Sequence, residues 1–199
     1  MKTIKVGIIG SGGIARAHAE AYKRLPYVEV AAVADIVTGR AKQFAEAQGL
    51  ANAAAFDSHE ELLKLPLDAV SICTPNAAHY RTTIDALRAG KHVLLEKPMS
   101  VTLAEAEDMV AARRAAGTIL SIGFQPRYDP NMKLVTEIVR SGRLGDIYYV
   151  EVGGGRRRGM PGGTFIRKEL AGAGVLADLG CYSLDLALNA LGHPRPLTV

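Results

Sequence analysis

The residues that could do chemistry first appear as a glycine loop near the N-terminus. Gly10 and Gly12, followed by Ala15, have the spacing of a dinucleotide-binding loop, and a short, mostly aliphatic run directly precedes them. That order predicts a buried strand, a tight turn and then a helix. Free N–H groups at the start of the helix, with the positive end of its dipole, suit a diphosphate. The residues expected to bind it are Gly10, Gly12, Gly13 and Ile14.

An acidic residue, Asp35, follows the second expected strand at residues 28–34. A carboxylate about 20 residues beyond such a loop accepts hydrogen bonds from an adenosine ribose, so the combination favours a bound dinucleotide over a purely structural turn. The charge of Asp35 would repel a 2′-phosphate, which favours NAD as the cofactor. Arg40 is close enough in sequence to leave NADP open.

Short strands then alternate with helices as far as residue 141. The runs at 67–74, 91–95 and 119–123 have the composition of buried strands, and helical patterns lie between them. This alternation predicts an α/β fold with a doubly wound parallel sheet, whose ligands bind at the carboxyl ends of the strands. The residues at those ends are Thr74, Pro75, Asn76, Glu96, Lys97, Gln125 and Arg127. Asn76 is also placed to cap the next helix.

The pattern changes beyond Gly145. Residues 146–152 have the β-branched and aromatic composition of a strand, 174–191 have the pattern of a helix, and 196–199 suggest the opening of another strand. We therefore divide the chain into a dinucleotide-binding domain, residues 1–123, and an incomplete second domain, residues 124–199.

The expected helix of the second domain carries a narrow polar stripe. Its members recur at helical spacing on a helix otherwise dominated by Leu, Ala and Cys. The stripe consists of Asp178, Tyr182, Asp185 and Asn189. A functional site is the favoured interpretation, and simple exposure to solvent is the alternative.

The composition limits the class of protein. With 48% hydrophobic and 22% charged residues, the 199-residue chain can bury a core. No apolar run approaches the roughly 20 residues of a membrane span, and the start does not resemble a secretory leader. We therefore expect a cytoplasmic protein without a membrane partner. Cys73 and Cys181 are too few and too far apart for a disulfide framework or a zinc site, and no metal is expected.

The net charge of +4 invites a nucleic-acid interpretation, but only the run at 156–158 is strongly basic. It consists of arginines between glycines, without interleaved aromatic residues. So short a basic segment is weak support for nucleic-acid binding, and no nucleic-acid partner is expected. A solvated loop is the favoured interpretation of the run. Contact with an anionic substrate or another subunit is the alternative.

Four blocks of the sequence are similar to the Gfo/Idh/MocA family of oxidoreductases. They are the glycine loop with Asp35, TPNAAHYRTTIDALRAGKHVLLEKP at 74–98, GFQPRYDP at 123–130 and GAGVLADLGCYSLD at 172–185. The resemblance implies a Rossmann domain followed by an α/β domain on an open, mainly antiparallel sheet that binds substrate and joins subunits in a homo-oligomer. It also implies hydride transfer between a nicotinamide and a hydroxyl carbon of a sugar, polyol or related compound.

The resemblance also implies catalytic roles. Lys97 matches the family's catalytic lysine, Pro98 commonly follows a cis bond in relatives, and Asp178 matches the acid of the catalytic group. Many members carry histidine four residues after that aspartate, whereas this sequence has Tyr182. An alcohol that loses a hydride must also lose its hydroxyl proton, so Lys97 and Tyr182 are expected to handle that proton. The alternative for Lys97 is a surface ion pair with Glu96.

Arg127 and His79 also have candidate roles. Arg127 is a candidate substrate contact, together with Lys97, Asp178 and Tyr182, although it could equally pair with Asp129. His79 matches a family histidine on the helix after Asn76, and a structural role is preferred for it.

The length bears on activity, because family chains are usually much longer. A lone strand in the second domain would leave its edges unsatisfied, so we expect a fragment or truncated product, or completion of the sheet by another chain. The leading interpretation is an NAD(P)-dependent dehydrogenase. The alternative is a regulatory or sensor protein that binds a dinucleotide without chemistry, and a hydrolase that uses NAD internally is a third possibility.

Overall fold

The computed structural model describes residues 2–154, 159 and 162–199, and the basic run at 156–158 lies outside them. By its internal contacts the chain divides into two compact units. The first unit comprises Met1–Gly123 together with Glu169–Gly172, and the second comprises Phe124–Lys168 together with Ala173–Val199.

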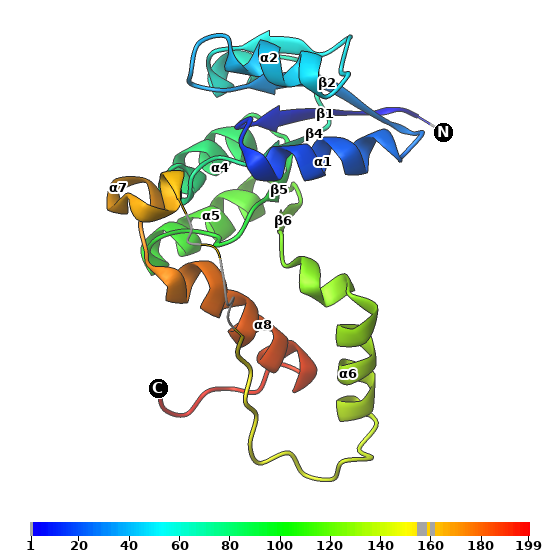
Figure 1. Cartoon of the computed structure of the whole chain (residues 1–199), viewed down its shortest axis with the longest axis vertical. Helices are drawn as coiled ribbons and strands as arrows, with labels where there is room; N and C mark the ends of the chain where they lie inside the picture. Colours follow the sequence, from blue (N-terminus) through cyan, green and yellow to red (C-terminus); the bar gives the residue numbers. More distant parts are fainter. Residues whose placement is uncertain (1, 155–158, 160–161) are drawn as a thin grey trace. The chain divides into compact units, whose positions relative to one another are not determined.

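The first unit is built on one sheet of six parallel strands in the order β3-β2-β1-β4-β5-β6 (Figure 1). The strands are β1 (Ile4–Ile9), β2 (Val28–Ala34), β3 (Ala54–Phe56), β4 (Ala69–Ile72), β5 (His92–Leu95) and β6 (Leu120–Ile122). This confirms the predicted parallel sheet. The strand order reverses between β1 and β4, which is where ligands bind in doubly wound sheets.

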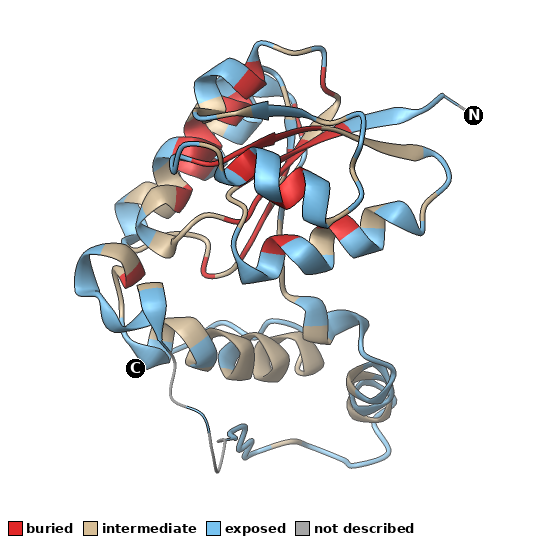
Figure 2. Cartoon of the chain, turned by 45° about the horizontal axis from the view of Figure 1, so that its top comes forward, coloured by how far each residue is buried: buried red, intermediate tan, exposed pale blue. Residues whose placement is uncertain are grey.

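Helices cover both faces of this sheet. They are α1 (Gly13–Lys23), α2 (Arg40–Ala47), α3 (His59–Leu63), the 3₁₀ turn η1 (Asn76–Ala78), α4 (His79–Arg88) and α5 (Leu103–Ala116). One buried cluster joins α1 and α2 to the face that carries Ile8 and Val33. The other joins α3, α4 and α5 to the face that carries Val70 and Leu95. The buried residues gather on the strands and on the sides of the helices that meet them (Figure 2).

Local sequence signals fix several helix ends. Thr102 and Glu105 form a reciprocal capping box at the start of α5, and Gly117 ends that helix in the left-handed conformation. The predicted cap at Asn76 is wrong. Pro75 occupies the N-cap position of η1, and the Asn76 side chain instead donates a hydrogen bond to the carbonyl oxygen of Ala171 at 3.1 Å.

The second unit is helical in the residues that the structure describes. Its elements are η2 (Gln125–Tyr128), α6 (Pro130–Arg140), η3 (Gly163–Ile166), the π-helical turn η4 (Leu176–Gly180) and α8 (Cys181–Ala190). A short helix, α7 (Lys168–Ala171), begins in this unit and ends in the first. The expected helix at 174–191 is thus confirmed in outline, with a π-helical first turn.

The strands expected in the second unit are absent from its described residues. Residues 146–152 and 196–199 form no strand, and the mainly antiparallel sheet is not observed. Tyr148 is 98% exposed. The physical reason is that strand propensity reflects packing against neighbouring strands, and this segment has no neighbour to pair with in the described structure.

One helical stretch among the described residues, Lys168–Ala190, is long and apolar enough to cross a membrane by length and composition alone. Gly172 interrupts it with a left-handed backbone (φ 69°), and Asp178 and Asp185 lie within it. Length and composition are weak support for a membrane helix, because helices of soluble domains pass the same test.

His79 joins the connections that follow β4 and β5. Its ring is buried, with Nδ1 2.7 Å from the carbonyl oxygen of Pro98 and Nε2 3.0 Å from that of Thr74. Burial lowers the pKa of His79, although both carbonyls and the nearby Glu96 act in the opposite direction. This arrangement fits the structural role expected for His79.

The lowered pKa of His79 predicts acid sensitivity. As the pH falls, the imidazole of His79 takes up a proton in the unfolded chain before it does so in the folded protein. The free energy of unfolding therefore keeps its full value above about pH 6.5, and below that pH it declines by at most about 1.4 kcal/mol per pH unit. His79→Asn cannot titrate. It should lower stability at neutral pH but flatten the decline between about pH 7 and pH 5 in urea denaturation. The exposed His193→Asn should keep the wild-type slope, and an unchanged slope in His79→Asn would contradict this account.

Gly10 is the glycine that the fold requires most strictly. Its φ is 88°, and a Cβ there would lie 2.7 Å from the backbone carbon and oxygen of Cys73. Gly10→Ala combines backbone strain with a clash against a rigid strand, so we expect a loss of about 3–5 kcal/mol in unfolding free energy. Gly39→Ala has a similar φ of 76° but open space around the new methyl group. Denaturant titration should show a loss of only about 1–2 kcal/mol there, and equal losses would refute the clash.

Candidate functional site

The glycine loop crosses the carboxyl end of β1 and leads into α1. The Gly10 N–H donates to the carbonyl oxygen of Ala34 at 2.8 Å, which holds the loop against the end of β2. A Cβ at Gly12 or Gly13 would meet no atom within 4 Å. Gly12 is the N-cap residue of α1, and no side chain caps its amides in the described structure. The start of α1 therefore offers N–H groups and open space, which is what a diphosphate needs.

Asp35 lies beside this loop, as predicted. Its carboxylate accepts hydrogen bonds from Ser11 N at 2.9 Å, Ser11 Oγ at 2.6 Å and Val37 N at 2.9 Å. Arg40 Nη1 lies 3.9 Å from Oδ1. Burial raises the pKa of Asp35, but these donors and Arg40 together hold that pKa below its ordinary value. Asp35 is therefore a carboxylate that can accept from ribose hydroxyls.

The connection after β4 contains Thr74, Pro75 and Asn76. Thr74 Oγ1 is buried and has no hydrogen-bond partner within the described part of the chain. A buried hydroxyl of this kind costs free energy unless a partner is present, so it fits an additional polar group at this edge. The Asn76 side chain donates to the carbonyl oxygen of Ala171, and the cofactor contact expected for Asn76 stays a prediction.

The connection after β5 contains Glu96, Lys97 and Pro98. The Lys97–Pro98 peptide bond is cis, as the resemblance implies. Glu96 is only 5% exposed, and its Oε2 accepts from the Lys97 backbone N–H at 3.3 Å. Lys97 itself is partly buried. The carboxylate of Glu96 therefore lies inside the first unit, and the cofactor contact expected for Glu96 stays a prediction.

His18 of α1 also lies in this region, although the sequence analysis gives it no role. Its Nε2 lies 2.9 Å from Glu96 Oε1, and its Nδ1 lies 3.1 Å from Ser71 Oγ. The available signal was a polar side chain at a position where the helix meets the sheet, because such a group needs a partner when buried. Helical spacing alone does not identify that partner.

In the second unit, Tyr182 meets the segment that follows Gly123. Its hydroxyl donates to Gln125 Oε1 at 2.8 Å, and its ring stands edge-on to Phe124 with centroids 6.1 Å apart. The Gln125 side chain is thus the hydrogen-bond acceptor for Tyr182, and the cofactor contact expected for Gln125 stays a prediction.

Arg127 pairs with Asp185 through one edge of its guanidinium. Nε donates to Oδ2 at 2.8 Å, and Nη2 donates to Oδ1. The hydrogen bonds that Arg127 donates to Asp185 raise the pKa of Arg127. Asp129, the alternative partner considered from sequence, instead caps α6 by accepting from Asn131 N and Met132 N.

Asp178 lies in the π-helical turn that precedes α8, one turn before Tyr182. Single π-helical turns inside helices are frequently found at functional sites. Two members of the predicted polar stripe, Tyr182 and Asp185, contact residues of η2 rather than only solvent.

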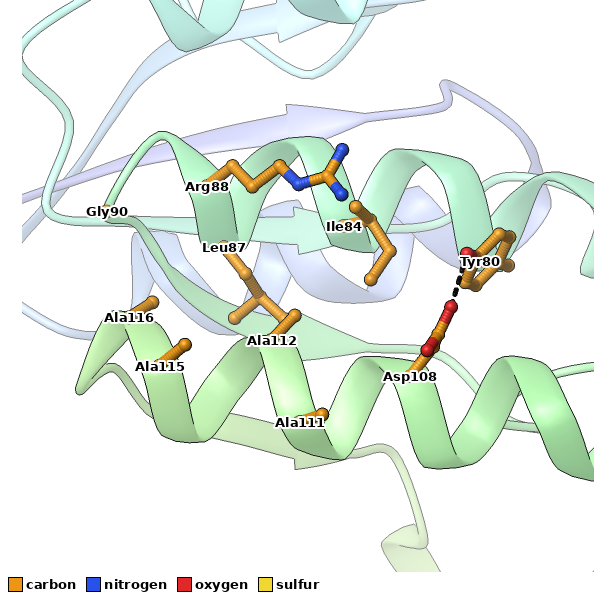
Figure 3. A pocket seen from close by; sticks show the side chains of 10 residues that line it. All are labelled: Tyr80, Ile84, Leu87, Arg88, Gly90, Asp108, Ala111, Ala112, Ala115 and Ala116. Carbon is orange, nitrogen blue, oxygen red and sulfur yellow. Dashed lines mark hydrogen bonds between the residues drawn. The ribbon is translucent and has the colours of Figure 1, made fainter.

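The predicted site residues fall into two groups. The glycine loop, Asp35, Thr74–Asn76, Glu96 and Lys97 belong to the first unit, whereas Gln125, Arg127, Asp178 and Tyr182 belong to the second. A separate pocket of about 600 Å³ lies between α4 and α5 (Figure 3). Four alanines of α5 line one side of it, and its other lining residues include Ile84, Leu87, Arg88 and the hydrogen-bonded pair Tyr80 and Asp108. It contains none of the predicted residues.

His59, Glu60 and Asp85 are a group of potential metal ligands among the described residues. His59 Nε2 is 3.1 Å from Asp85 Oδ2, and Arg81 Nε donates to the same oxygen at 2.7 Å. Asp85 is thus already engaged by two cationic or polar partners, so we assign no metal to this group.

The comparisons with known proteins identify the family of the chain. The sequence model of the family described as "Oxidoreductase family, NAD-binding Rossmann fold" matches residues 4–124, and that of the "GFO/IDH/MocA C-terminal domain" matches residues 132–199. D-glucoside 3-dehydrogenase of Escherichia coli is 39% identical over 98% of this chain and 56% of its own length. Myo-inositol 2-dehydrogenase of Thermotoga maritima is 30% identical over 96% of this chain and 55% of its own.

Solved structures show the same likeness. Aldose-aldose oxidoreductase from Caulobacter crescentus, complexed with glycerol, superposes with a TM-score of 0.85 at 32% identity, over 96% of this chain and 58% of that one. GenD2 from gentamicin A biosynthesis, in complex with NAD, gives a TM-score of 0.84 at 25% identity, over 98% and 55%. The chain spans about half the length of these relatives. It belongs to the Gfo/Idh/MocA family of oxidoreductases, and its first unit is the NAD-binding Rossmann fold of that family.

Proposed function

We propose that the protein is an NAD-dependent dehydrogenase that transfers a hydride between the nicotinamide and a hydroxyl carbon of a sugar or polyol. The observation that carries the proposal is the position of Lys97. It follows β5 on the same sheet edge as the glycine loop after β1 and Asp35 after β2. The relatives named for glucoside and inositol dehydrogenation support the substrate class.

NAD, when bound, supplies the hydride acceptor, and the chain's own residues would bind it and manage the proton. The amides at Gly12 and Gly13 would hold the diphosphate, and Asp35 the adenosine ribose. The buried Thr74 Oγ1 would gain a hydrogen-bond partner from the cofactor at the same edge of the sheet. Lys97 would stabilise the negative charge that develops on the substrate oxygen as its proton leaves.

The second unit would supply the proton-transfer group. Tyr182 has a hydroxyl that can exchange a proton with a substrate hydroxyl, and Asp178 lies one helical turn before it to orient or assist. Arg127 is proposed as a substrate contact that Asp185 holds in place, because Asp185 binds one edge of its guanidinium, through Nε and Nη2. These roles rest on the family match of the motif and on the polar contacts within the second unit.

Replacing the lysine separates chemistry from cofactor binding. In the natural full-length protein, Lys97→Met should lower turnover at least about 100-fold, because the cation near the reacting oxygen is lost. NADH affinity, followed by fluorescence, should change less than about threefold. Lys42→Met, at an exposed lysine of α2, is the matched control and should keep full turnover.

Wild-type turnover in Lys97→Met would refute the catalytic assignment. A wild-type protein that binds NADH tightly but reduces or oxidises no member of a panel of sugars and polyols would favour the non-catalytic sensor instead.

The choice of cofactor depends on Asp35. A 2′-phosphate would approach this carboxylate, so the wild-type protein should bind NAD at least about tenfold more tightly than NADP. Arg40, 3.9 Å from Asp35, is positioned to pair with a phosphate once the carboxylate is removed. Asp35→Ser should therefore reduce or reverse the preference in calorimetric titration.

Asp57→Ser is the control for this experiment. Asp57 also accepts a backbone N–H near the start of α2, that of Gly39, but it follows the edge strand β3. The Asp57→Ser substitution should leave the preference for NAD over NADP unchanged. Equal affinities of the wild-type protein for NAD and NADP would overturn the role of Asp35. Homo-oligomerisation through the second unit and a cytoplasmic location stay predictions, the first testable by sedimentation.

A further inference from the structure

A buried hydrogen-bonded chain connects the helix that follows the glycine loop with the connection that carries Lys97. His18, on the second turn of α1, reaches Glu96 at the end of β5 at a distance of 2.9 Å. The two residues are 78 positions apart in sequence. Their side chains are 11% and 7% exposed, so water screens the contact only weakly. The contact lies entirely within the first unit.

The groups on the other side of His18 fix the orientation of its ring. Its Nδ1 lies 3.1 Å from Ser71 Oγ on β4, and the Tyr22 hydroxyl is hydrogen-bonded to the same oxygen. A carboxylate only accepts, so His18 Nε2 carries the hydrogen that it donates to Glu96. Ser71 can then donate to Nδ1 and accept from Tyr22. Each of these groups is satisfied by one consistent arrangement of hydrogens.

Glu96 is in turn held at several points along its length. Its backbone N–H donates to the carbonyl oxygen of Ile72 at 3.0 Å, and its Oε2 accepts from the Lys97 backbone N–H. The space for the carboxylate exists because residue 123 is glycine: a Cβ there would lie 3.1 Å from Oε1. The carboxylate thus has a defined place, bounded by His18 on one side and by the Lys97 backbone on the other.

We propose that His18 is a positioning residue for Lys97. It holds the Glu96 carboxylate in the interior, and through that carboxylate it fixes the backbone at Lys97 relative to α1. Without His18, the buried carboxylate would lose a hydrogen-bond donor in a site of low polarity, and it would have to move toward water. That movement releases the Lys97 backbone. The catalytic meaning of this role rests on the proposed function, but the positioning itself does not.

The test uses the accessibility of Lys97 in the native protein without any cofactor. Lys97 is labelled with limiting acetic anhydride at mildly alkaline pH, and the rate of its acetylation is measured by peptide mass spectrometry. In His18→Phe, which keeps a ring but removes both ring nitrogens, we expect Lys97 to react about threefold to tenfold faster, the factor that corresponds to one lost hydrogen bond. Acetylation of Lys42 serves as the internal reference.

Matched variants separate positioning from a general loss of stability. His59→Phe also removes a histidine that contacts a carboxylate, Asp85 at 3.1 Å, but from α3. It should lower the melting temperature without altering the rate at Lys97. His18→Gln retains an N–H donor at a similar reach and should restore most of the wild-type rate. If His18→Phe is not recovered folded, Ser71→Ala takes its place, and we expect an acceleration of about twofold from the loss of ring orientation.

An unchanged rate at Lys97 in the folded His18→Phe variant, or in Ser71→Ala where it is the substitute, would overturn the proposal, and so would an equal acceleration in His59→Phe. The measurement remains decisive whether or not the protein is a dehydrogenase. A wild-type protein that binds no dinucleotide would defeat the proposed function, while the acetylation rates would still decide the role of His18.

Discussion

The reversal of strand order between β1 and β4 is the constraint on which the rest of the first unit depends. At this point the chain leaves β1 toward one face of the sheet and leaves β4 toward the other, so the two connections diverge at the carboxyl edge. The backbones must still approach closely there. Gly10 lies against the backbone of Cys73, and only a residue without a side chain fits. The glycine loop is thus shaped by the sheet before any ligand is considered.

Several buried polar groups lie at the same edge of the sheet, and each of them would be unfavourable there without a hydrogen-bond partner. Asp35 accepts from Ser11 and Val37, His79 bridges two carbonyl oxygens, and Glu96 accepts from His18. Each such group is expensive to bury alone and acceptable when its partners are in place. A buried polar network of this kind adds directional contacts between elements that apolar packing alone would leave free to shift. This explains how loops on the surface of the sheet can hold defined positions.

Local signals in the sequence were sufficient for the sheet and for much of its edge. The strand ending at Asp35 was predicted with the bounds of β2, because a buried parallel strand is nearly continuously aliphatic. The capping box at Thr102 and the parallel order of the strands also follow from short-range patterns.

The features that were not predicted correctly depend on contacts between residues that are distant in the sequence. Asn76 meets Ala171, 95 positions away, so its cap role could not be excluded from the neighbouring residues. His18 of α1 meets Glu96, 78 positions away, and helical spacing identifies only the face of the helix on which His18 lies. The expected strand at 146–152 failed for a related reason. β-branched and aromatic residues favour a strand only where another strand accepts their hydrogen bonds, and the sequence of one segment cannot supply its partner.

Tyrosine at position 182 makes a different demand on its surroundings from the histidine that many family members carry. Its ring packs edge-on against Phe124 while its hydroxyl donates to Gln125, so the apolar body and the polar tip have separate partners. The amide of Gln125 is neutral and accepts the hydroxyl hydrogen without competing for it as a base. Asp185, the stronger acceptor on the same helix, is occupied by Arg127. The second unit therefore orients the phenol through one apolar and one polar contact.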